Sequence, residues 1–273
     1  MIYPSIDPVA FHLGPLVVRW YGLAYVAAFV GAALVLRRLN RVWQIGISDD
    51  HQIDIVLAAI IGVIVGGRLG YVLFYGGSEY LTHPLRILAT WDGGMSFHGG
   101  LAGILLAGWL VSKRIGVPYL QLVDLGAVGA PIGFLLGRIT NFVNGELWGR
   151  VTTAPWGMVF PTGGPLPRHP SQLYEAFLEG FVLFAVLLWL ARRRRADGMI
   201  FGALLTGYAA FRILVEFVRE PDLQLGFIAG PFTMGQLLSV PMLLAGVWVL
   251  TRAVKAEKAE RTSRAMTGDE VGE

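Results

Sequence analysis

Residues 53–75 read IDIVLAAIIGVIVGGRLGYVLFY, a run of twenty-three residues in which only Asp54 and Arg68 carry charge. A helix needs about 20 mostly apolar residues to cross the hydrocarbon core of a bilayer, and this run is long enough. We therefore predict a transmembrane helix over residues 53–75.

Six further apolar runs of similar length are spread along the chain. Hydrophobic residues make up 55% of the 273 residues and charged residues 15%, a composition that cannot cover a soluble domain with polar surface. We expect an all-α integral membrane protein with about seven transmembrane helices, forming a single polytopic domain over residues 1–273. The other six runs are approximately 16–37, 96–113, 120–142, 172–191, 197–218 and 233–252.

Basic residues follow every odd-numbered run. Cytoplasmic helix ends are enriched in Lys and Arg, so these junctions predict an N-terminus outside and a C-terminus inside. The same junctions explain the net charge of +3 without a nucleic-acid partner. The residues concerned are Arg37, Arg38 and Arg41, then Lys113 and Arg114, then Arg192 to Arg195, and last Arg252, Lys255, Lys258, Arg261 and Arg264.

Three segments lie between or beyond the runs. Residues 143–170 are rich in Gly, Pro and Trp and predict a small extramembrane cap on the outer side, while residues 76–94 mix apolar and polar residues as a segment lying along the membrane surface does. Residues 254–273 are polar and predict a cytoplasmic tail.

Ionisable side chains inside apolar helices are expensive, so each one is a functional candidate. Tyr208, Arg212 and Glu216 recur every four residues and share one helix face. Arg212 is the better functional candidate, whereas Glu216 is either functional or only its neutralising partner. Arg68 either binds a ligand or reaches to the interface. Asp124 lies close to a cytoplasmic helix end, where we expect a helix cap or a hydrated contact.

His98 lies in a glycine-rich segment, WDGGMSFHGG, at residues 91–100. Glycines allow a substrate to approach the backbone, so His98 is a candidate for catalysis or ligand binding, although a structural histidine is the alternative. Ser96 lies nearby without the Gly-x-Ser-x-Gly elbow of a serine hydrolase. The chain has no cysteine and no His-Glu-x-x-His motif, so we expect no metal or cofactor, and any reacting thiol must come with a substrate.

The run GRITNFVNGELWG covers residues 137–149 at the outer end of the fourth predicted helix. Arg138 and Asn141 are one helical turn apart and present donors to the same place. The guanidinium fork suits a phosphate, and a lipid headgroup is the phosphate available at this depth. The run therefore predicts an anion site.

Together these motifs resemble those of the bacterial prolipoprotein diacylglyceryl transferases. The family's signature, to which residues 137–149 correspond, has Gly where this chain has Thr140; this change removes no charged or hydrogen-bonding group. The segments that carry the resemblance are residues 19–23, 66–71, 91–100, 137–149, 168–175 and 207–222.

The resemblance implies transfer of the diacylglyceryl group from phosphatidylglycerol to the lipobox cysteine thiol of a preprolipoprotein, with a thioether and glycerol phosphate as products. It also implies seven helices, a site open to the outer leaflet and a small periplasmic head. We accordingly expect a multi-pass protein of the bacterial cytoplasmic (inner) membrane, surrounded by membrane lipids.

That chemistry assigns roles to the candidate residues. A thiol must be deprotonated to react, and either His98 or Glu146 is the candidate base; Glu146 alternatively holds an arginine in place. Arg138 and Arg212 stabilise the departing phosphate. The expected substrate-binding residues are Tyr21, Arg68, Asn141, Asn144, Gly149, Tyr208 and Glu216.

The main alternative is a lipid or small-molecule transporter or flippase. A transport path needs polar groups on both sides of the membrane midplane, whereas the polar residues predicted here collect in the outer half. A lipid-binding receptor without catalysis is a third, weaker reading.

Overall fold

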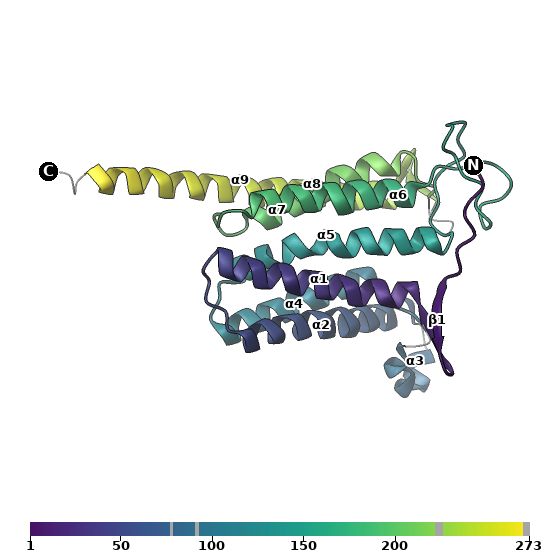
Figure 1. Cartoon of the computed structure of the whole chain (residues 1–273), viewed down its shortest axis with the longest axis horizontal. Helices are drawn as coiled ribbons and strands as arrows, with labels where there is room; N and C mark the ends of the chain where they lie inside the picture. Colours follow the sequence, from purple (N-terminus) through teal and green to yellow (C-terminus); the bar gives the residue numbers. More distant parts are fainter. Residues whose placement is uncertain (77–78, 91–92, 222–225, 270–273) are drawn as a thin grey trace. The chain divides into compact units, whose positions relative to one another are not determined.

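The computed structural model describes residues 1–76, 79–90, 93–221 and 226–269, and most of these residues are helical (Figure 1). The chain forms two compact units, Met1–Trp43 with Asp124–Glu273, and Gln44–Val123. The expected all-α architecture is confirmed, since the strands are confined to two short hairpins.

The first unit begins with an antiparallel hairpin rather than with a helix. Strands β1 (Val9–Leu13) and β2 (Leu16–Arg19) pair around a turn at Gly14, which has a φ of 60°. Helix α1 (Trp20–Val42) follows. The helix of the run predicted at approximately 16–37 therefore begins at Trp20, because Pro15 and the β-branched Val17 and Val18 favour extended backbone before it.

The remaining elements of this unit follow residue 118. Helix α5 has its first residues in the other unit, and the fifth predicted run is divided into α6, a π-helical segment and α7. The bounds are α5 Tyr119–Val143, α6 Ser171–Glu175, η3 Ala176–Val182, α7 Leu183–Leu190, α8 Met199–Glu216, β3 Phe227–Ala229, β4 Phe232–Thr233 and α9 Met234–Asp269.

Small residues let these helices approach closely. A Cβ atom at Gly180 of η3 would lie 2.7 Å from the Cα atom of Leu135 on α5, and one at Gly202 of α8 would lie 2.6 Å from the backbone nitrogen of Leu250 on α9. Such contacts are how transmembrane helices pack without a hydrophobic driving force. The backbone of η3 therefore packs directly against α5, and that of α8 against α9.

Asp124 caps a neighbouring helix, as the sequence predicted. Its carboxylate accepts hydrogen bonds of 2.7 Å from the backbone N–H groups of Gly198 and Phe201, at the start of α8. A carboxylate at a helix N-terminus satisfies donors that have no partner within the helix. Asp124 thus fixes the end of α8 opposite to Glu216.

The second unit pairs α2 (Asp49–Tyr75) with α4 (Phe97–Ile115), and α3 (Glu79–Thr82) and η1 (Pro84–Leu88) lie between them in the chain. A Cβ atom at Gly66 of α2 would lie 2.4 Å from the carbonyl oxygen of Gly99 on α4. The two backbones are therefore in direct contact at the start of α4.

Six helices of the described residues are long and apolar enough to cross a membrane. The run expected at 96–113 forms α4, which is not among them, so the seventh crossing stays a prediction. The run predicted at 233–252 corresponds to α9, which continues to Asp269. Most of the predicted tail, residues 254–273, is therefore part of this helix. The six are Trp20–Val42, Asp49–Tyr75, Tyr119–Val143, Ser171–Leu190, Met199–Glu216 and Met234–Ser263.

Candidate active site

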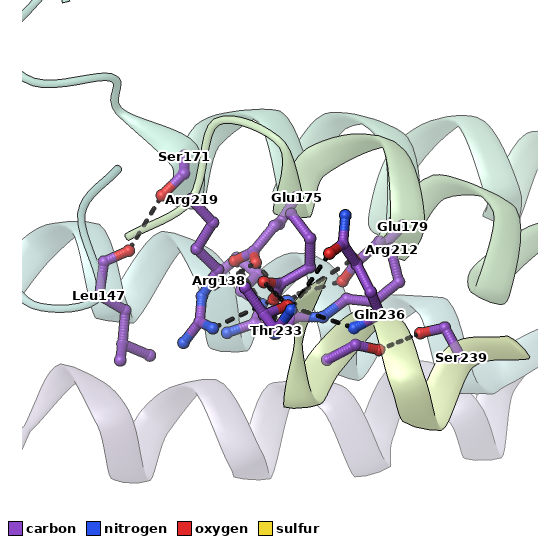
Figure 2. Close-up of polar contacts among 12 residues, drawn as sticks. Arg138, Leu147, Ser171, Glu175, Glu179, Arg212, Arg219, Thr233, Gln236 and Ser239 are labelled. Atoms are coloured by element: carbon purple, nitrogen blue, oxygen red, sulfur yellow. Dashed lines mark hydrogen bonds and ion pairs between the residues drawn. The ribbon is translucent and has the colours of Figure 1, made fainter. Parts of the chain in front are cut away.

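Six charged side chains meet inside the unit that contains α5 and α8, and Figure 2 shows most of them pointing toward one another. They come from three transmembrane segments and the turn beyond α8. We call them the ion cluster: Arg138 of α5, Glu175 of α6, Glu179 of η3, Arg212 and Glu216 of α8, and Arg219.

Glu175 is the centre of the ion cluster. Its Oε2 atom lies 2.9 Å from Nε of Arg138, and its Oε1 atom accepts a hydrogen bond from Nη1 of Arg212. The carboxylate is completely buried. A buried charge needs paired and hydrogen-bonded partners, and here one carboxylate joins the two arginines that the sequence assigned to phosphate binding.

Glu216 forms the second binding point for Arg212. Its Oε1 atom lies 2.8 Å from Nη2 of Arg212 and 3.1 Å from Nη1 of Arg219, while Thr233 donates to Oε2 at 2.8 Å. The Arg212–Glu216 pair expected from their spacing is therefore present. Glu216 acts on the arginines within the protein, and its binding of a substrate stays a prediction.

Glu179 contrasts with the other two carboxylates. It is also completely buried, yet its oxygens approach Arg138 and Arg212 only to 3.9 Å each. Among the described residues, no hydrogen bond reaches either oxygen. Glu179 therefore contributes negative charge to the cluster without fixing the orientation of either guanidinium group.

The arginines form the accessible edge of the cluster. The side chains of Arg138 and Arg212 are 19% and 13% exposed, whereas those of Glu175 and Glu216 are 0% exposed. An anion that reaches this region meets guanidinium groups first, with carboxylates behind them that hold each fork in one orientation. Such preorganised donors stabilise negative charge as it develops.

Asn141 connects Arg138 to Glu146. Nη1 of Arg138 lies 3.4 Å from Oδ1 of Asn141, whose Nδ2 donates to Oε1 of Glu146 at 2.9 Å. Asn144 donates to the same Glu146 oxygen at 3.2 Å. Among the described residues, both amides that reach the Glu146 carboxylate donate to Oε1. Glu146 acts on Arg138 through an amide.

Thr140 faces the helix that carries it. Its hydroxyl donates to the carbonyl oxygens of Leu136 at 2.6 Å and Gly137 at 3.0 Å, and the residue is buried. The Thr140 hydroxyl therefore bonds to the backbone of its own helix and does not compete for the guanidinium group of Arg138.

The family model for prolipoprotein diacylglyceryl transferase matches residues 8–252 of this chain. The chain belongs to the prolipoprotein diacylglyceryl transferase family.

Individual members of the family match along nearly their whole length. A protein of Geobacter sulfurreducens is 54% identical over 254 residues, covering 93% of this chain and 96% of its own. A protein of Rhizobium meliloti is 51% identical over 267 residues, covering 94% and 95%. One from Gluconobacter oxydans is 51% identical over 260 residues, covering 93% and 95%. Each is named phosphatidylglycerol–prolipoprotein diacylglyceryl transferase.

The other predicted residues of this family member lie in different places. Gly149 packs tightly, since a Cβ atom there would lie 2.5 Å from the Val218 carbonyl oxygen. Tyr208 packs its ring 4.9 Å from that of Phe134. Tyr21 is exposed on α1, with its hydroxyl 3.4 Å from that of Tyr25. Their contacts with a substrate stay predictions.

His98 and Arg68 belong to the unit of residues 44–123. His98 is exposed in the first turn of α4, where the Ser96 hydroxyl accepts from the backbone N–H of Gly99 at 3.2 Å and caps the helix. The expectation that His98 acts together with Arg138 and Arg212 stays a prediction.

Arg68 is buried, and its guanidinium group bonds to the backbone of its own unit. Its guanidinium group donates to four backbone carbonyl groups and lies over the rings of Tyr71 and Tyr80. This arrangement fixes the segment around η1 against α2, and headgroup binding by Arg68 stays a prediction. The acceptors are Ile87 at 2.8 Å, Gly93 at 2.5 Å, Gly94 at 3.2 Å and Arg86 at 2.5 Å.

Three members of the ion cluster were not singled out from the sequence. Glu175 and Glu179 lie within the fifth predicted transmembrane run, so the rule that marked Arg212 as a candidate applies to them equally. Arg219 follows the end of α8, where a basic residue in sequence alone suggests only an interface contact.

Proposed function

We propose that this protein transfers the diacylglyceryl group of phosphatidylglycerol to the lipobox cysteine thiol of a preprolipoprotein. The single observation that supports this reaction most directly is the pairing of Arg138 and Arg212 through Glu175, in a family member whose relatives carry the name of this transferase. The remaining steps follow from what each side chain offers.

The arginines act on the leaving group. The thiolate sulfur forms a bond to the glyceryl carbon while the carbon–oxygen bond to phosphate breaks, and the electron pair leaves with glycerol phosphate. Arg138 and Arg212 offer guanidinium donors where that charge grows, and Glu175 holds them so that little reorganisation is needed. Asn141, which contacts Arg138, orients the headgroup.

A base must remove the proton of the thiol before or during attack. Glu146 and His98 remain the two candidates. The amides of Asn141 and Asn144 orient Oε1 of Glu146 and leave Oε2 for a proton. His98 offers an exposed imidazole at the start of α4. Both assignments are tested by the pH dependence described in the Discussion.

We place the reaction at the outer side of the bacterial cytoplasmic membrane, with the N-terminus outside and residues 143–170 as the periplasmic cap. The ion cluster supports this side, because it lies near the end of α5, the start of α6 and the end of α8. These three ends are predicted to be outer ends by the basic residues at the opposite junctions. A transporter requires polar groups across the midplane instead.

The experiment uses the purified chain, phosphatidylglycerol in detergent micelles and a lipobox peptide. We expect the peptide to gain the mass of a diacylglyceryl group in a bond that resists hydroxylamine, as a thioether does. A peptide with Ser in place of the lipobox Cys is the matched control and should gain nothing. No mass gain with the Cys peptide, under conditions where the protein remains folded, contradicts the proposal.

Arg138→Ala then tests the role of this arginine in catalysis. Removing one donor from the departing phosphate should lower kcat by about a hundredfold or more, equal to roughly 3 kcal/mol of barrier. Near-normal turnover of this variant would remove Arg138 from the mechanism.

A further inference from the structure

The turn that carries Glu146 is held in an unusual backbone conformation. Gly145 and Leu147, on either side of Glu146, have φ values of 66° and 58°. Leucine has a Cβ atom, so the left-handed conformation is unfavourable and persists only where the surroundings enforce it. Something other than local preference therefore fixes this turn.

Three successive carbonyl groups of the turn each accept a side-chain hydrogen bond. The donors come from the cap and from the start of α6, far along the chain, and Figure 2 shows the Ser171 hydroxyl pointing to the Leu147 carbonyl group. The pairs are Thr162 Oγ1 to Gly145 at 2.7 Å, Gln172 Nε2 to Glu146 at 2.6 Å, and Ser171 Oγ to Leu147 at 3.0 Å.

Gln172 holds the middle carbonyl group, that of Glu146 itself. Its side chain is completely buried, and within the described residues its Oε1 atom has no hydrogen-bond partner. A buried polar atom without a hydrogen-bond partner destabilises the fold. An apolar side chain of similar size would avoid this loss but would leave the Glu146 carbonyl group without its donor, so what the amide contributes at this position is its contact with Glu146.

The Gln172 contact fixes the peptide group from which the Glu146 side chain departs. With that peptide fixed, the carboxylate reaches Nδ2 of Asn141 at 2.9 Å and Nδ2 of Asn144 at 3.2 Å. Asn141 in turn contacts Arg138. A rotation of the peptide group would move the carboxylate away from both amides.

We propose that Gln172 is a positioning residue for the transfer reaction: its buried amide holds the Glu146 carbonyl group and thereby aims the Glu146 carboxylate at the reacting groups. The inference rests on the proposed function and extends it to a residue that touches no substrate. Gln172 acts only through Glu146, and this makes a specific prediction about the two residues together.

The test is a double-mutant cycle on the full-length protein in the transfer assay. Gln172→Met keeps the length of the side chain but removes the donor, and Glu146→Asp keeps a carboxylate but shortens its reach. Gln172→Met alone should lower kcat by about tenfold to a hundredfold, the scale of a small misplacement of a reacting group, with KM for the peptide within about twofold. In the Glu146→Asp background it should lower kcat by less than about threefold.

Trp156→Phe is the matched control. It removes a 2.6 Å hydrogen bond to Tyr174 from the same cap, and kcat should stay within about twofold of wild type. Should Gln172→Met not fold, Gln172→Asn replaces it, because that variant keeps a buried amide on an arm one methylene too short.

The outcomes separate this inference from the proposed function. Losses that multiply in the double variant, or full activity of Gln172→Met, overturn the role of Gln172 while leaving the transferase intact. No thioether with the wild-type protein overturns the proposed function itself. A fall in thermal stability that accompanies multiplied losses assigns Gln172 to the fold rather than to Glu146 and also overturns the inference.

Discussion

The Nε atom of Arg138 lies 2.9 Å from the Oε2 atom of Glu175, and this contact links α5 to α6 inside the membrane-spanning unit. The other oxygen of Glu175 holds Arg212 of α8. One carboxylate thus sets the separation of two guanidinium groups on different helices. The separation of two donors determines which anion they can hold together, so in the proposed reaction Glu175 sets the geometry of the phosphate-binding arginines without contacting the phosphate.

Glu175→Gln should therefore impair transfer severely. The amide keeps the shape of the side chain but cannot balance the charges of Arg138 and Arg212, and removing one partner of an ion pair whose carboxylate is completely buried is unfavourable by about 3–5 kcal/mol. We expect a fall in kcat of about a hundredfold together with a lower thermal transition. Steady-state kinetics and thermal unfolding in detergent measure the two effects.

Glu179→Gln is the control for that variant. Glu179 is equally buried but makes no hydrogen bond to another described residue, so an amide of the same shape should keep the arginines where they are. We expect kcat within about threefold of wild type. A Glu179 variant that is as inactive as Glu175→Gln would show that net charge, and not the pairing geometry, governs the site.

The pH dependence of His98→Gln and Glu146→Gln distinguishes the base. Without its base, the enzyme depends on substrate thiol that ionises by itself, and free cysteine has a pKa of about 8.5. The defect of the base variant should therefore shrink as the pH rises from 6 toward about 8.5, whereas the defect of the other variant should stay constant. Measured kcat/KM ratios that stay constant for both variants contradict both assignments.

Arg68→Met should destabilise the unit of residues 44–123. The variant leaves several carbonyl groups around η1 without their donor, and each such loss is unfavourable by roughly 1–3 kcal/mol where the group is buried. Arg114→Ala in the same unit is the control, since Arg114 is 72% exposed and pairs with Asp54 at 3.5 Å. Thermal unfolding should separate the two clearly, and equal transitions would contradict the structural role of Arg68.

Gly66→Ala tests the close contact between α2 and α4. A Cβ atom 2.4 Å from the Gly99 carbonyl oxygen forces the two backbones apart, so we expect a lower thermal transition and loss of folded protein. Gly126→Ala in α5 has open space around its Cβ position and should be neutral or stabilising by about 0.5–1 kcal/mol. Equal stability of the two variants would show that this contact is not tight in the folded protein.

The helices could be predicted from apolar run length because the bilayer sets one thickness for every crossing helix. The start of α1 was harder to place, since Leu16, Val17 and Val18 are as apolar as the helix that follows, and their pairing with β1 is seen only in the structure. Arg138 and Arg212 could be identified as candidates because a charged side chain within an apolar helix is unfavourable in the membrane, whichever residue pairs with it.

The ion-pair partners of Arg138 and Arg212 on other helices could not be predicted from the sequence. Glu175 lies in an apolar run like Arg212, but nothing in its spacing says that it joins Arg138 to Arg212. The left-handed conformation of Leu147 is equally hidden, since leucine rarely adopts it and the side chains that bind the turn, Ser171 and Gln172, are distant in sequence. Tertiary contacts, and not local preference, decide both.

The most direct measurement follows both products of a single reaction. Phosphatidylglycerol labelled in its headgroup is incubated with the lipobox peptide and the purified protein. One glycerol phosphate should be released for each thioether formed, and Arg138→Ala should slow both together by about a hundredfold. Release of glycerol phosphate without a thioether, or lipid movement without either product, would contradict the transferase mechanism.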